Sequence, residues 1–378
     1  MKIAFVIDDT VDKPDGVQQY VLTLGEWFRS RGHDVHYLAG ESSRQDIPNV
    51  HSLSRNIAVR FNGNRLTVPR PANARKIRAL LEAEKFDVLH VQMPYSPMMA
   101  HKVIMQAPAG TAIVGTFHIM PESQLVARGT KLLGRWLRKS LDRFDQVYAV
   151  SPVAREFAKT AFGLPKVTTL PNVVSMADYA SVRPPQDPAA VPTVMFLGRL
   201  VPRKGCATFL DAVGELRYLY EKPFKAVVCG KGPLLDDLKR QASRLGIADI
   251  VEFAGFVPEA DKPQRLADAS VVAFPSSGGE SFGIVLLEAM AAGQNGGGPV
   301  VLGANNPGYA SVLIPRPELL FRPGDHKELA TKMAHYLQDG LDRADTLAWQ
   351  QMHIRQFDVA AVGQRLLAGY AAHLRKTA

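Results

Sequence analysis

The stretch 270–293 constrains the fold more than any other part of the chain. An apolar run at 270–275 predicts a short buried strand. Two glycines then allow a tight turn, and 284–292 predicts a helix that Gly293 ends. This order of strand, glycine turn and helix places backbone N–H groups and the positive end of a helix dipole at the C-terminal edge of a sheet. Such an edge binds anions, and phosphate is the usual one.

Two carboxylates flank this predicted anion site. Glu280 lies in the turn, where it can face a sugar while the amides after it hold a phosphate. Glu288 lies two turns along the helix, so it cannot touch the same atom and is better placed to bind a ribose diol. The residues between them complete the predicted anion site: Ser281, Phe282, Gly283, Ile284 and Val285.

The spacing of the two glutamates, with Ser-Phe-Gly-Ile-Val-Leu-Leu between them and Ala-Met-Ala-Ala-Gly after, resembles the retaining glycosyltransferases of family four. These are GT-B enzymes that use nucleotide-sugar donors. The resemblance implies an α/β chain with two doubly wound Rossmann-like domains facing a central cleft. It also implies a C-terminal helix that crosses back to the N-terminal domain.

Length and composition agree with a two-domain cytoplasmic protein. The 378 residues exceed one ordinary core, and 46% hydrophobic with 21% charged residues is typical of a soluble protein. The chain enters a strand at once, without the layout of a signal peptide, and no apolar run approaches the ~20 residues that span a bilayer. Cys206 and Cys229 lie in apolar contexts without ligand spacing, which fits a reduced compartment and excludes a cysteine-bound structural metal.

Strands and helices alternate in both halves, which predicts doubly wound parallel sheets. We expect an acceptor-binding domain at 1–174, a Pro-rich linker at 175–192, a nucleotide-sugar-binding domain at 193–356, and a crossover helix at 357–378. The expected strands are 3–7, 35–38, 88–91, 112–116, 146–150, 193–197, 226–229, 251–253, 271–274 and 300–302. The expected helices of the first domain are 18–31, 73–84 and 130–143.

Gly16 and His118 both follow predicted strands of the first domain, where ligands of such sheets bind. Gly16 would let the backbone approach a diphosphate, although the family usually has two glycines where this chain has Asp15-Gly16. His118 matches the family's active-site histidine, and we expect it to hydrogen-bond the transferred sugar without necessarily acting as a base. The alternatives are a plain turn glycine and a structural histidine.

Arg199 and Lys204 follow the first strand of the second domain, five residues apart. Fixed cations there would stabilise a departing nucleoside diphosphate more in the transition state than in the ground state. This is also the family's Arg-to-Lys spacing, and it replaces a divalent metal, so we expect no metal requirement. Arg203 can assist, and the alternative is that these are surface cations.

Two further loops of the second domain belong to the expected donor site. Gly230 and Lys231 begin a glycine-rich loop that lacks the third glycine of a dinucleotide fingerprint, so a dehydrogenase is not supported. The resemblance places the backbone of Gly255 and Val257 at the nucleobase. Backbone contacts read bases poorly, so GDP and UDP stay undistinguished. The loop 294–299 is longer than the family's usual return to a strand, and we expect it to loosen a connection behind the Glu288 helix.

The net charge of +9 is concentrated in the first half, where residues 1–180 carry 23 basic against 16 acidic side chains. The segment 47–81 has seven basic residues and no acidic one, including Arg75, Lys76 and Arg78 on a predicted helix. This is either a solvated face or a surface for anionic lipid, where each basic residue contributes ~1 kcal/mol. Nucleic acid is disfavoured because interleaved aromatics and a known motif are missing.

The acceptor side is similar to the phosphatidylinositol mannosyltransferases, which carry an Asn-Gly turn and a basic membrane-facing helix. By that resemblance Gln18, Asn62 and one of Arg65 or Arg70 would contact the head of an acidic lipid. The segment 131–141 places Leu133, Trp136, Leu137 and Leu141 on one stripe among basic residues. The stripe either lies on a membrane or packs on the sheet.

These features favour an enzyme that moves mannose from GDP-mannose, with retention, to a lipid such as phosphatidylinositol at the inner face of the cell membrane. A UDP-sugar with another lipid or soluble acceptor is the alternative within this class. The non-enzymatic alternative is a module that binds an anionic surface or nucleic acid and keeps a vestigial donor cleft.

Overall fold

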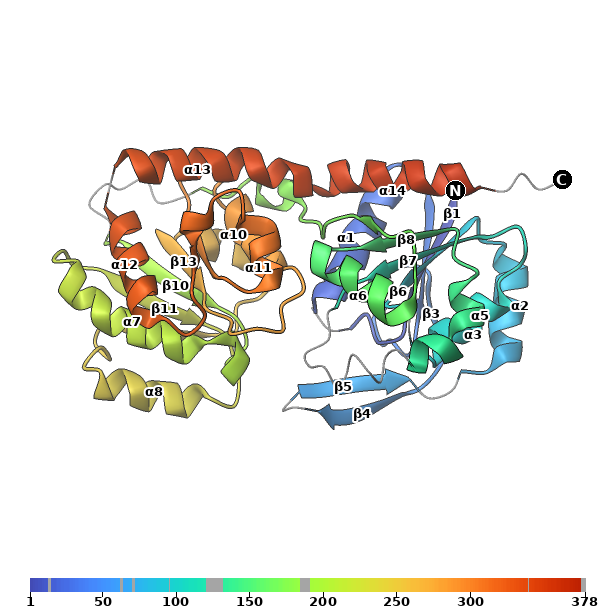
Figure 1. Ribbon diagram of the computed structural model, residues 1–378, viewed down its shortest axis with the longest axis horizontal. Helices are drawn as coiled ribbons and strands as arrows, with labels where there is room; N and C mark the ends of the chain where they lie inside the picture. The colour runs from blue at the N-terminus through green and yellow to red at the C-terminus, as the bar shows by residue number, and fades with distance from the viewer. Residues whose placement is uncertain are drawn as a thin grey trace. The chain divides into compact units, whose positions relative to one another are not determined.

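The computed structural model describes residues 1–12, 15–61, 64–69, 72–94, 96–119, 132–183, 191–338 and 340–374. The chain forms two compact units (Figure 1). Unit 1 comprises Met1–Val173 and Val359–Ala378, and unit 2 comprises Val174–Asp358. Each unit is built on a parallel sheet covered by helices, so the predicted fold class is confirmed.

The sheet of unit 1 has the strand order β3-β2-β1-β6-β7-β8-β9, and all its pairs are parallel. Chain order therefore reverses between β1 and β6, the point where doubly wound sheets bind ligands. Every strand expected in this unit is present. The strands are β1 Lys2–Ile7, β2 Asp34–Ala39, β3 Val50–Ser52, β6 Val88–Gln92, β7 Ala112–Phe117, β8 Gln146–Ala149 and β9 Thr168–Thr169.

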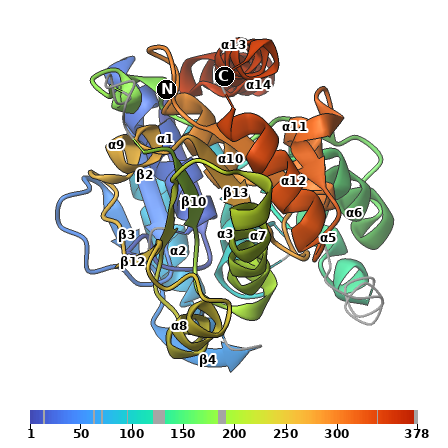
Figure 2. The ribbon, with the colours of Figure 1, turned by 90° about the vertical axis from the view of Figure 1, so that its left-hand side faces the viewer.

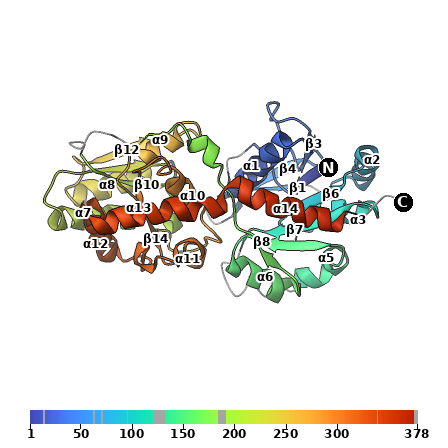
Figure 3. The same cartoon turned by 90° about the horizontal axis from the view of Figure 1, so that it is seen from above.

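Helices cover both faces of this sheet. Ile3, Phe5 and Ile7 pack with α1 and α14, whereas the alternate residues of β1 pack with α2 and α3 (Figure 3). Since successive strand side chains point to opposite faces, these are the two sides of one sheet. The helices are α1 Gly16–Ser30, α2 Ala74–Glu84, α3 Met99–Gln106, α5 Arg138–Leu141, α6 Pro152–Phe162 and α14 Val359–His373.

The last helix belongs to unit 1, as the family resemblance implied. The Tyr370 hydroxyl lies 2.6 Å from Nδ1 of His90 on β6, and both side chains are buried. Gly363 faces Trp27 of α1 so closely that a Cβ on Gly363 would lie 2.6 Å from the indole ring. A side-chain hydrogen bond and a close helix–helix contact thus fix α14 to this sheet.

Two parts of unit 1 differ from the sequence-based expectation. β4 Asn56–Phe61 and β5 Asn64–Pro69 form an antiparallel hairpin that was not expected, and its Asn-Gly turn lies outside the described residues. The helix expected at 130–143 is interrupted: 132–136 is helical, Leu137 forms a turn, and α5 follows.

The sheet of unit 2 has the order β12-β11-β10-β13-β14-β15, again parallel, with its reversal between β10 and β13. α7 and α12 lie side by side on it (Figure 2). The strands are β10 Thr193–Leu197, β11 Lys225–Cys229, β12 Val251–Gly255, β13 Val271–Phe274, β14 Val300–Ala304 and β15 Leu320–Phe321. The helices are α7 Cys206–Leu219, α8 Leu235–Arg244, α9 Lys262–Ala267, α10 Ile284–Ala291, α11 Pro307–Leu313, α12 His326–Leu337 and α13 Leu341–His353. The 3₁₀ turns are η1 Met176–Tyr179, η2 Pro202–Lys204, η3 Pro317–Leu319 and η4 Ile354–Phe357.

The long loop 294–299 is fixed to the start of unit 2. Asn295 Nδ2 donates to the carbonyl oxygens of Tyr179, Ala180 and Val182 at 3.2, 3.0 and 2.9 Å. Gln294 Nε2 donates to the carbonyl oxygen of Met176 at 2.7 Å. The expectation that this loop loosens a connection is therefore wrong, because the loop holds part of the segment expected as a linker against unit 2.

Candidate active site

The reversal of strand order in unit 2 brings two loops together in space. The loop after β10 carries Arg199 and the short η2 turn with Arg203 and Lys204. The loop after the neighbouring β13 carries Ser276 and Glu280. Both loops leave the C-terminal edge of the sheet, which is where the sequence placed the donor site.

Glu280 is the centre of this cluster. Its Oε1 atom lies 2.8 Å from Nη1 of Arg203, 2.8 Å from Nζ of Lys204 and 2.9 Å from the Ser276 hydroxyl. The Glu280 side chain is 12% exposed and that of Lys204 is 18% exposed. One carboxylate thus fixes two cations on the edge of the sheet.

The charges in this cluster shift one another's pKa values. Burial alone would raise the pKa of Glu280, but Lys204 and Arg203 outweigh burial and hold it below its ordinary value. Burial lowers the pKa of Lys204, with smaller contributions from the positive charges of Arg203 and Arg199, while Glu280 opposes this shift. Glu280 is therefore a carboxylate at neutral pH, and the cations beside it form a concentrated positive field.

The cations that contact Glu280 differ in one respect from Arg199 and Lys204, the pair predicted from the sequence. Lys204 contacts Glu280 directly, and so does Arg203, whose role the sequence left open. Arg199 is exposed, and it lies near enough to affect the pKa of Lys204. Ser276 was not predicted, because its contact depends on how the turn folds back.

The start of α10 supplies the expected amide groups. Gly283, just before the helix, has φ = +116°, and a Cβ there would lie 2.6 Å from the Tyr309 ring. The first N–H groups of a helix, here those of Ile284 and Val285, have no acceptor within the helix. Phe282 is buried and packs edge-on against Phe357, with ring centroids 5.9 Å apart. The backbone here is thus fixed by packing.

Glu288 is buried in a second ion cluster. Its Oε1 accepts a hydrogen bond from Lys262 Nζ at 2.6 Å, and the same amine lies 2.6 Å from Glu259. Burial raises the pKa of Glu288, although Lys262 opposes this shift. The sequence singled out Glu288 but missed Lys262, which α9 brings next to it.

The loops after β11 and β12 pack tightly against the loop after β10. Gly230 has φ = +151°, and a Cβ there would lie 1.9 Å from the Gly198 carbonyl oxygen. Its N–H donates to the carbonyl oxygen of Gly255 at 2.6 Å. Lys231 Nζ lies 5.8 Å from the centroid of the Phe256 ring. The expected donor residues Gly230, Lys231, Gly255 and the adjacent Val257 thus share this edge of the sheet.

In unit 1, His118 follows the C-terminal end of β7, as the sequence predicted. It is buried, and its Nε2 lies 2.7 Å from Oε1 of Gln92, the last residue of β6. Because Gln92 Nε2 donates to the His90 carbonyl oxygen, Gln92 Oε1 faces His118 and accepts from it. Nδ1 is then the unprotonated nitrogen of His118. Burial lowers the pKa of His118 to about 3, so the ring is neutral at physiological pH.

Comparison with known proteins identifies the chain's family. Residues 14–178 match the model of glycosyltransferase family 4, and residues 183–348 match that of the group 1 glycosyl transferases. The phosphatidyl-myo-inositol mannosyltransferase of Mycolicibacterium smegmatis is 33% identical over 98% of this chain and 93% of its own length. The chain belongs to the family-four glycosyltransferases.

Two further similarities bear on this glycosyltransferase. The GDP-mannose-dependent alpha-(1-6)-phosphatidylinositol monomannoside mannosyltransferase of Mycobacterium tuberculosis is 28% identical, over 81% of this chain and 84% of that protein. The crystal structure of Anabaena HepE in complex with UDP and glucose superposes with a TM-score of 0.70 at 20% identity, over 98% of this chain and all of that one. The second likeness confirms the GT-B fold.

The acceptor residues expected in this glycosyltransferase are described only in part. Gly16, which was expected at the donor diphosphate, is the first residue of α1. The Gln18 side chain is buried and donates to the Thr10 carbonyl oxygen at 3.0 Å, which fixes the start of α1 to the loop after β1. Asn62 and Arg70 lie outside the described residues, and Arg65 lies on β5.

The basic helix α2 is formed as expected. Ile77 and Leu81 are buried against the sheet, and Arg75, Lys76 and Arg78 are exposed. The predicted apolar stripe at 131–141 fits neither interpretation completely. Leu137 and Leu141 are buried, as expected for packing on the sheet, whereas Trp136 is 61% exposed. None of the described helices is long and apolar enough to cross a bilayer.

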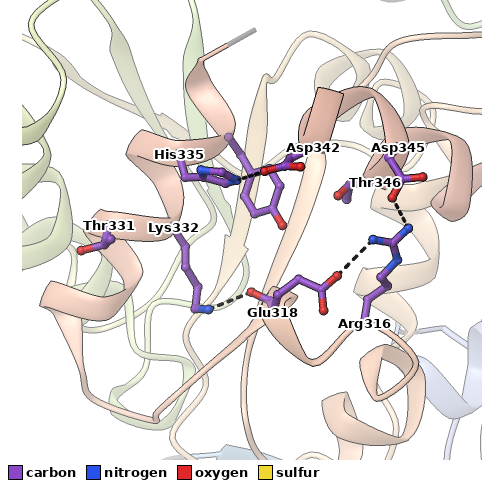
Figure 4. A pocket seen from close by; sticks show the side chains of 9 residues that line it. Arg316, Glu318, Thr331, Lys332, His335, Asp342, Asp345 and Thr346 are labelled. Carbon is purple, nitrogen blue, oxygen red and sulfur yellow. Dashed lines mark hydrogen bonds and ion pairs between the residues drawn. The ribbon is translucent and has the colours of Figure 1, made fainter. Parts of the chain in front are cut away.

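Unit 2 also has a polar pocket between α12, α13 and η3 (Figure 4). Arg316 donates to Glu318 at 3.1 Å and also contacts Asp345, while Lys332 donates to the Glu318 carbonyl oxygen at 2.8 Å. The charged groups are paired with one another, and none of the predicted site residues lines this pocket. It carries no part of the donor site.

Proposed function

We propose that this glycosyltransferase moves mannose from GDP-mannose to a hydroxyl group of a phosphatidylinositol-like lipid, with retention of the anomeric configuration. The observation that supports this proposal most is the Glu280 cluster, which holds Arg203 and Lys204 beside the N-terminus of α10. The mannose, the GDP and the inositol lipid are supported by the names of the similar mycobacterial enzymes.

The donor diphosphate would lie on the amide groups at the start of α10, close to Lys204, Arg203 and Arg199. The bond between C1 of the sugar and the phosphate oxygen breaks, so negative charge grows on the leaving group. Cations fixed in a partly buried site stabilise that charge with little reorganisation. We therefore expect transfer to proceed without a divalent metal ion.

The Glu280 carboxylate is proposed to orient the sugar hydroxyl groups rather than to attack C1, because its Oε1 atom is already bonded to two cations and a hydroxyl group. Retention then follows from attack on the face that the leaving group departs from. The acceptor oxygen bonds to C1, and its proton passes to the leaving phosphate oxygen. Neutral His118 would hydrogen-bond the transferred sugar from unit 1, and Glu288 the ribose of the nucleotide.

The lipid acceptor requires contact with a membrane surface. The exposed Arg75, Lys76 and Arg78 on α2 give unit 1 a basic helix face, and such residues favour anionic lipid by ~1 kcal/mol each. We propose that this face contacts anionic phospholipid at the inner side of the cell membrane, so the enzyme is a peripheral membrane protein.

The test is transfer of radiolabelled mannose from GDP-mannose to vesicles that contain phosphatidylinositol, with and without chelator. We expect a mannosylated lipid with the α linkage of the donor, and a rate that changes less than twofold when excess EDTA or magnesium is added. Glu280→Gln serves as the inactive control.

Each other outcome rejects a defined part of the proposal. Product formed only from UDP-sugars would show that GDP-mannose is not the donor. Loss of activity in EDTA that magnesium restores would reject the metal-free mechanism. No product with either donor, together with no nucleotide effect on the melting temperature, would leave only a binding module.

A further inference from the structure

A cluster of two histidines and a glutamate lies in unit 1 away from the predicted substrate edge. His36 is on β2, His51 on β3, and Glu84 is the last residue of α2. The helix α2 ends just before β6 begins, so Glu84 lies near the N-terminal edge of the sheet, whereas His118 and Gln92 lie at the C-terminal edge. The cluster is therefore separate from the chemistry described above.

The donor atoms of the cluster converge. Nδ1 of His36 lies 2.9 Å from Nε2 of His51, and the two rings are parallel within 2°. The ligand atoms of His36, His51 and Glu84 all lie within 4.8 Å of one another. Donors bound to tetrahedral zinc lie about 3.3 Å apart, given metal–ligand distances of about 2.0 Å. The histidine pair needs to open by only about 0.4 Å to reach that separation.

Asp34 fixes the tautomer of the buried His36. Its Oδ1 lies 3.1 Å from Nε2 of His36, so His36 donates from Nε2 and leaves the lone pair of Nδ1 directed at His51. In metal sites, a carboxylate commonly accepts a hydrogen bond from the far nitrogen of a ligating histidine and so orients its ring. Without a metal ion, His51 donates from Nε2 to His36. Binding requires that the His51 proton move to Nδ1, so the imidazole stays neutral.

The third donor, Glu84, is positioned by Lys2. The Lys2 amine contacts a carboxylate oxygen of Glu84. Nζ of Lys2 also lies 3.6 Å from Asp34, which offers the amine a second carboxylate if Glu84 turns to a cation.

We propose that His36, His51 and Glu84 bind one divalent transition-metal ion of the zinc type, with water as the fourth ligand. Two imidazole nitrogens and one carboxylate oxygen suit zinc, whereas magnesium and calcium prefer oxygen donors. The bound ion would join β2, β3 and α2, and so would hold the end of the basic helix to the sheet. The metal-free transfer mechanism does not depend on this ion, because the cluster lies at the other edge of the sheet.

The test is zinc binding by the full-length chain after chelator treatment and removal of the chelator. Calorimetry should show one site per chain, and Co²⁺ should give the visible absorption bands of a tetrahedral complex. We expect His51→Gln and Glu84→Gln each to weaken Zn²⁺ binding at least tenfold, and zinc to raise the melting temperature of the wild type but not of His51→Gln.

Two matched variants separate this site from surface binding. Glu82→Gln removes an exposed carboxylate from the same helix, and His335→Ala removes an exposed histidine that lies 3.3 Å from Asp342 in unit 2. Both should bind zinc like the wild type. Circular dichroism checks that His51→Gln is folded. Wild-type affinity equal to that of the His51 and Glu84 variants would overturn the proposal, as would binding lost only in His335→Ala.

Discussion

At the residue scale, the Glu280 carboxylate has two effects that oppose each other in donor binding. It holds Arg203 and Lys204 in place through contacts of 2.8 Å. The same negative charge repels the diphosphate that these cations are proposed to bind. Orientation of the cations and the sugar therefore costs some nucleotide affinity, and removal of the charge should separate the two effects.

We predict that Glu280→Gln lowers the rate of mannose transfer at least a hundredfold without weakening GDP binding. The amide keeps the size of the side chain, but it removes both the repulsion of the diphosphate and the orientation of the sugar. Single-turnover kinetics and calorimetry with GDP measure the two quantities. The matched control is Glu318→Gln in the polar pocket, which should change neither. A tenfold loss of GDP affinity in Glu280→Gln would contradict this division of roles.

Asp8 gives unit 1 a pH dependence of its own. Its Oδ1 accepts from the Ala100 N–H at 2.6 Å, at the start of α3, and its Oδ2 accepts from Ser96. Burial raises the pKa of Asp8 from 3.8 to about 6, although these hydrogen bonds oppose the shift. The folded state thus holds a proton that the unfolded state releases, so stability is lost as pH rises from about 4 through 6.

We predict that the stability of Asp8→Asn increases relative to that of the wild type as pH rises. The difference in unfolding free energy should grow by about 2–3 kcal/mol between pH 4 and pH 7.5, which is most of the effect of the pKa shift. Amide hydrogen exchange in β1 and β6 measures the stability of unit 1 alone. Glu82→Gln, at an exposed carboxylate of the same unit, should run parallel to the wild type. Parallel profiles for Asp8→Asn would show that the pKa of Asp8 is not raised.

The sequence identified single residues where local spacing sets the geometry. Glu280 and Lys204 lie together because each follows a strand of a doubly wound sheet. Arg203, Ser276 and Lys262 were missed or left open, because their contacts depend on how a turn or a short helix folds back. Local periodicity holds no information on such contacts.

At the scale of elements, the buried parallel strands were predictable because they are continuous apolar runs. The hairpin of β4 and β5 was not, because Arg60, Arg65 and Thr67 interrupt the apolar residues of its strands. The break at Leu137 was also missed. Leu137 and Leu141 are buried, whereas Trp136 is exposed and its ring centroid lies 5.1 Å from that of His101. The residues of the predicted stripe therefore do not share one environment.

The contact between α14 and α1 makes a sharp prediction about two helical glycines. In a helix interior, glycine to alanine normally stabilises by about 0.5–1 kcal/mol. Gly363→Ala should instead destabilise unit 1 by about 1–3 kcal/mol, because its Cβ would lie 2.6 Å from the ring of Trp27. Gly214→Ala on α7 is the control, since its nearest contact would be 3.7 Å away and it should follow the normal rule. Thermal melting of both variants decides, and stabilisation by Gly363→Ala would contradict the packing of α14.

At the scale of the whole molecule, the two units repeat one plan with different residues. Each reverses its strand order at the centre of a parallel sheet, and each places its predicted site residues at the C-terminal edge. Unit 2 gathers cations and carboxylates there, which suits a diphosphate sugar. Unit 1 places a buried neutral histidine there and carries the basic helix α2. The division supports separate tests of donor binding and membrane binding.

We predict that reversal of three charges on α2, in Arg75→Glu, Lys76→Glu and Arg78→Glu combined, weakens binding to anionic vesicles about a hundredfold or more. Each basic residue near such a surface contributes ~1 kcal/mol, so about 3 kcal/mol is lost before repulsion is counted. GDP affinity should stay unchanged, because the predicted donor residues of the Glu280 cluster lie in unit 2. Vesicle sedimentation at low and high salt measures the effect, which should fade at 1 M salt as charges are screened.

A matched variant separates the α2 surface from total charge. Lys239, Arg240 and Arg244 are exposed on α8 of unit 2, and their replacement by glutamate changes the net charge by the same amount. We expect this variant to keep most of the vesicle binding, because only a basic face close to the bilayer gains from its field. If both variants lost binding equally, the long-range charge of the protein would account for the attraction. If neither did, α2 would be a solvated face, and the lipid acceptor would have to be reached by another surface of this glycosyltransferase.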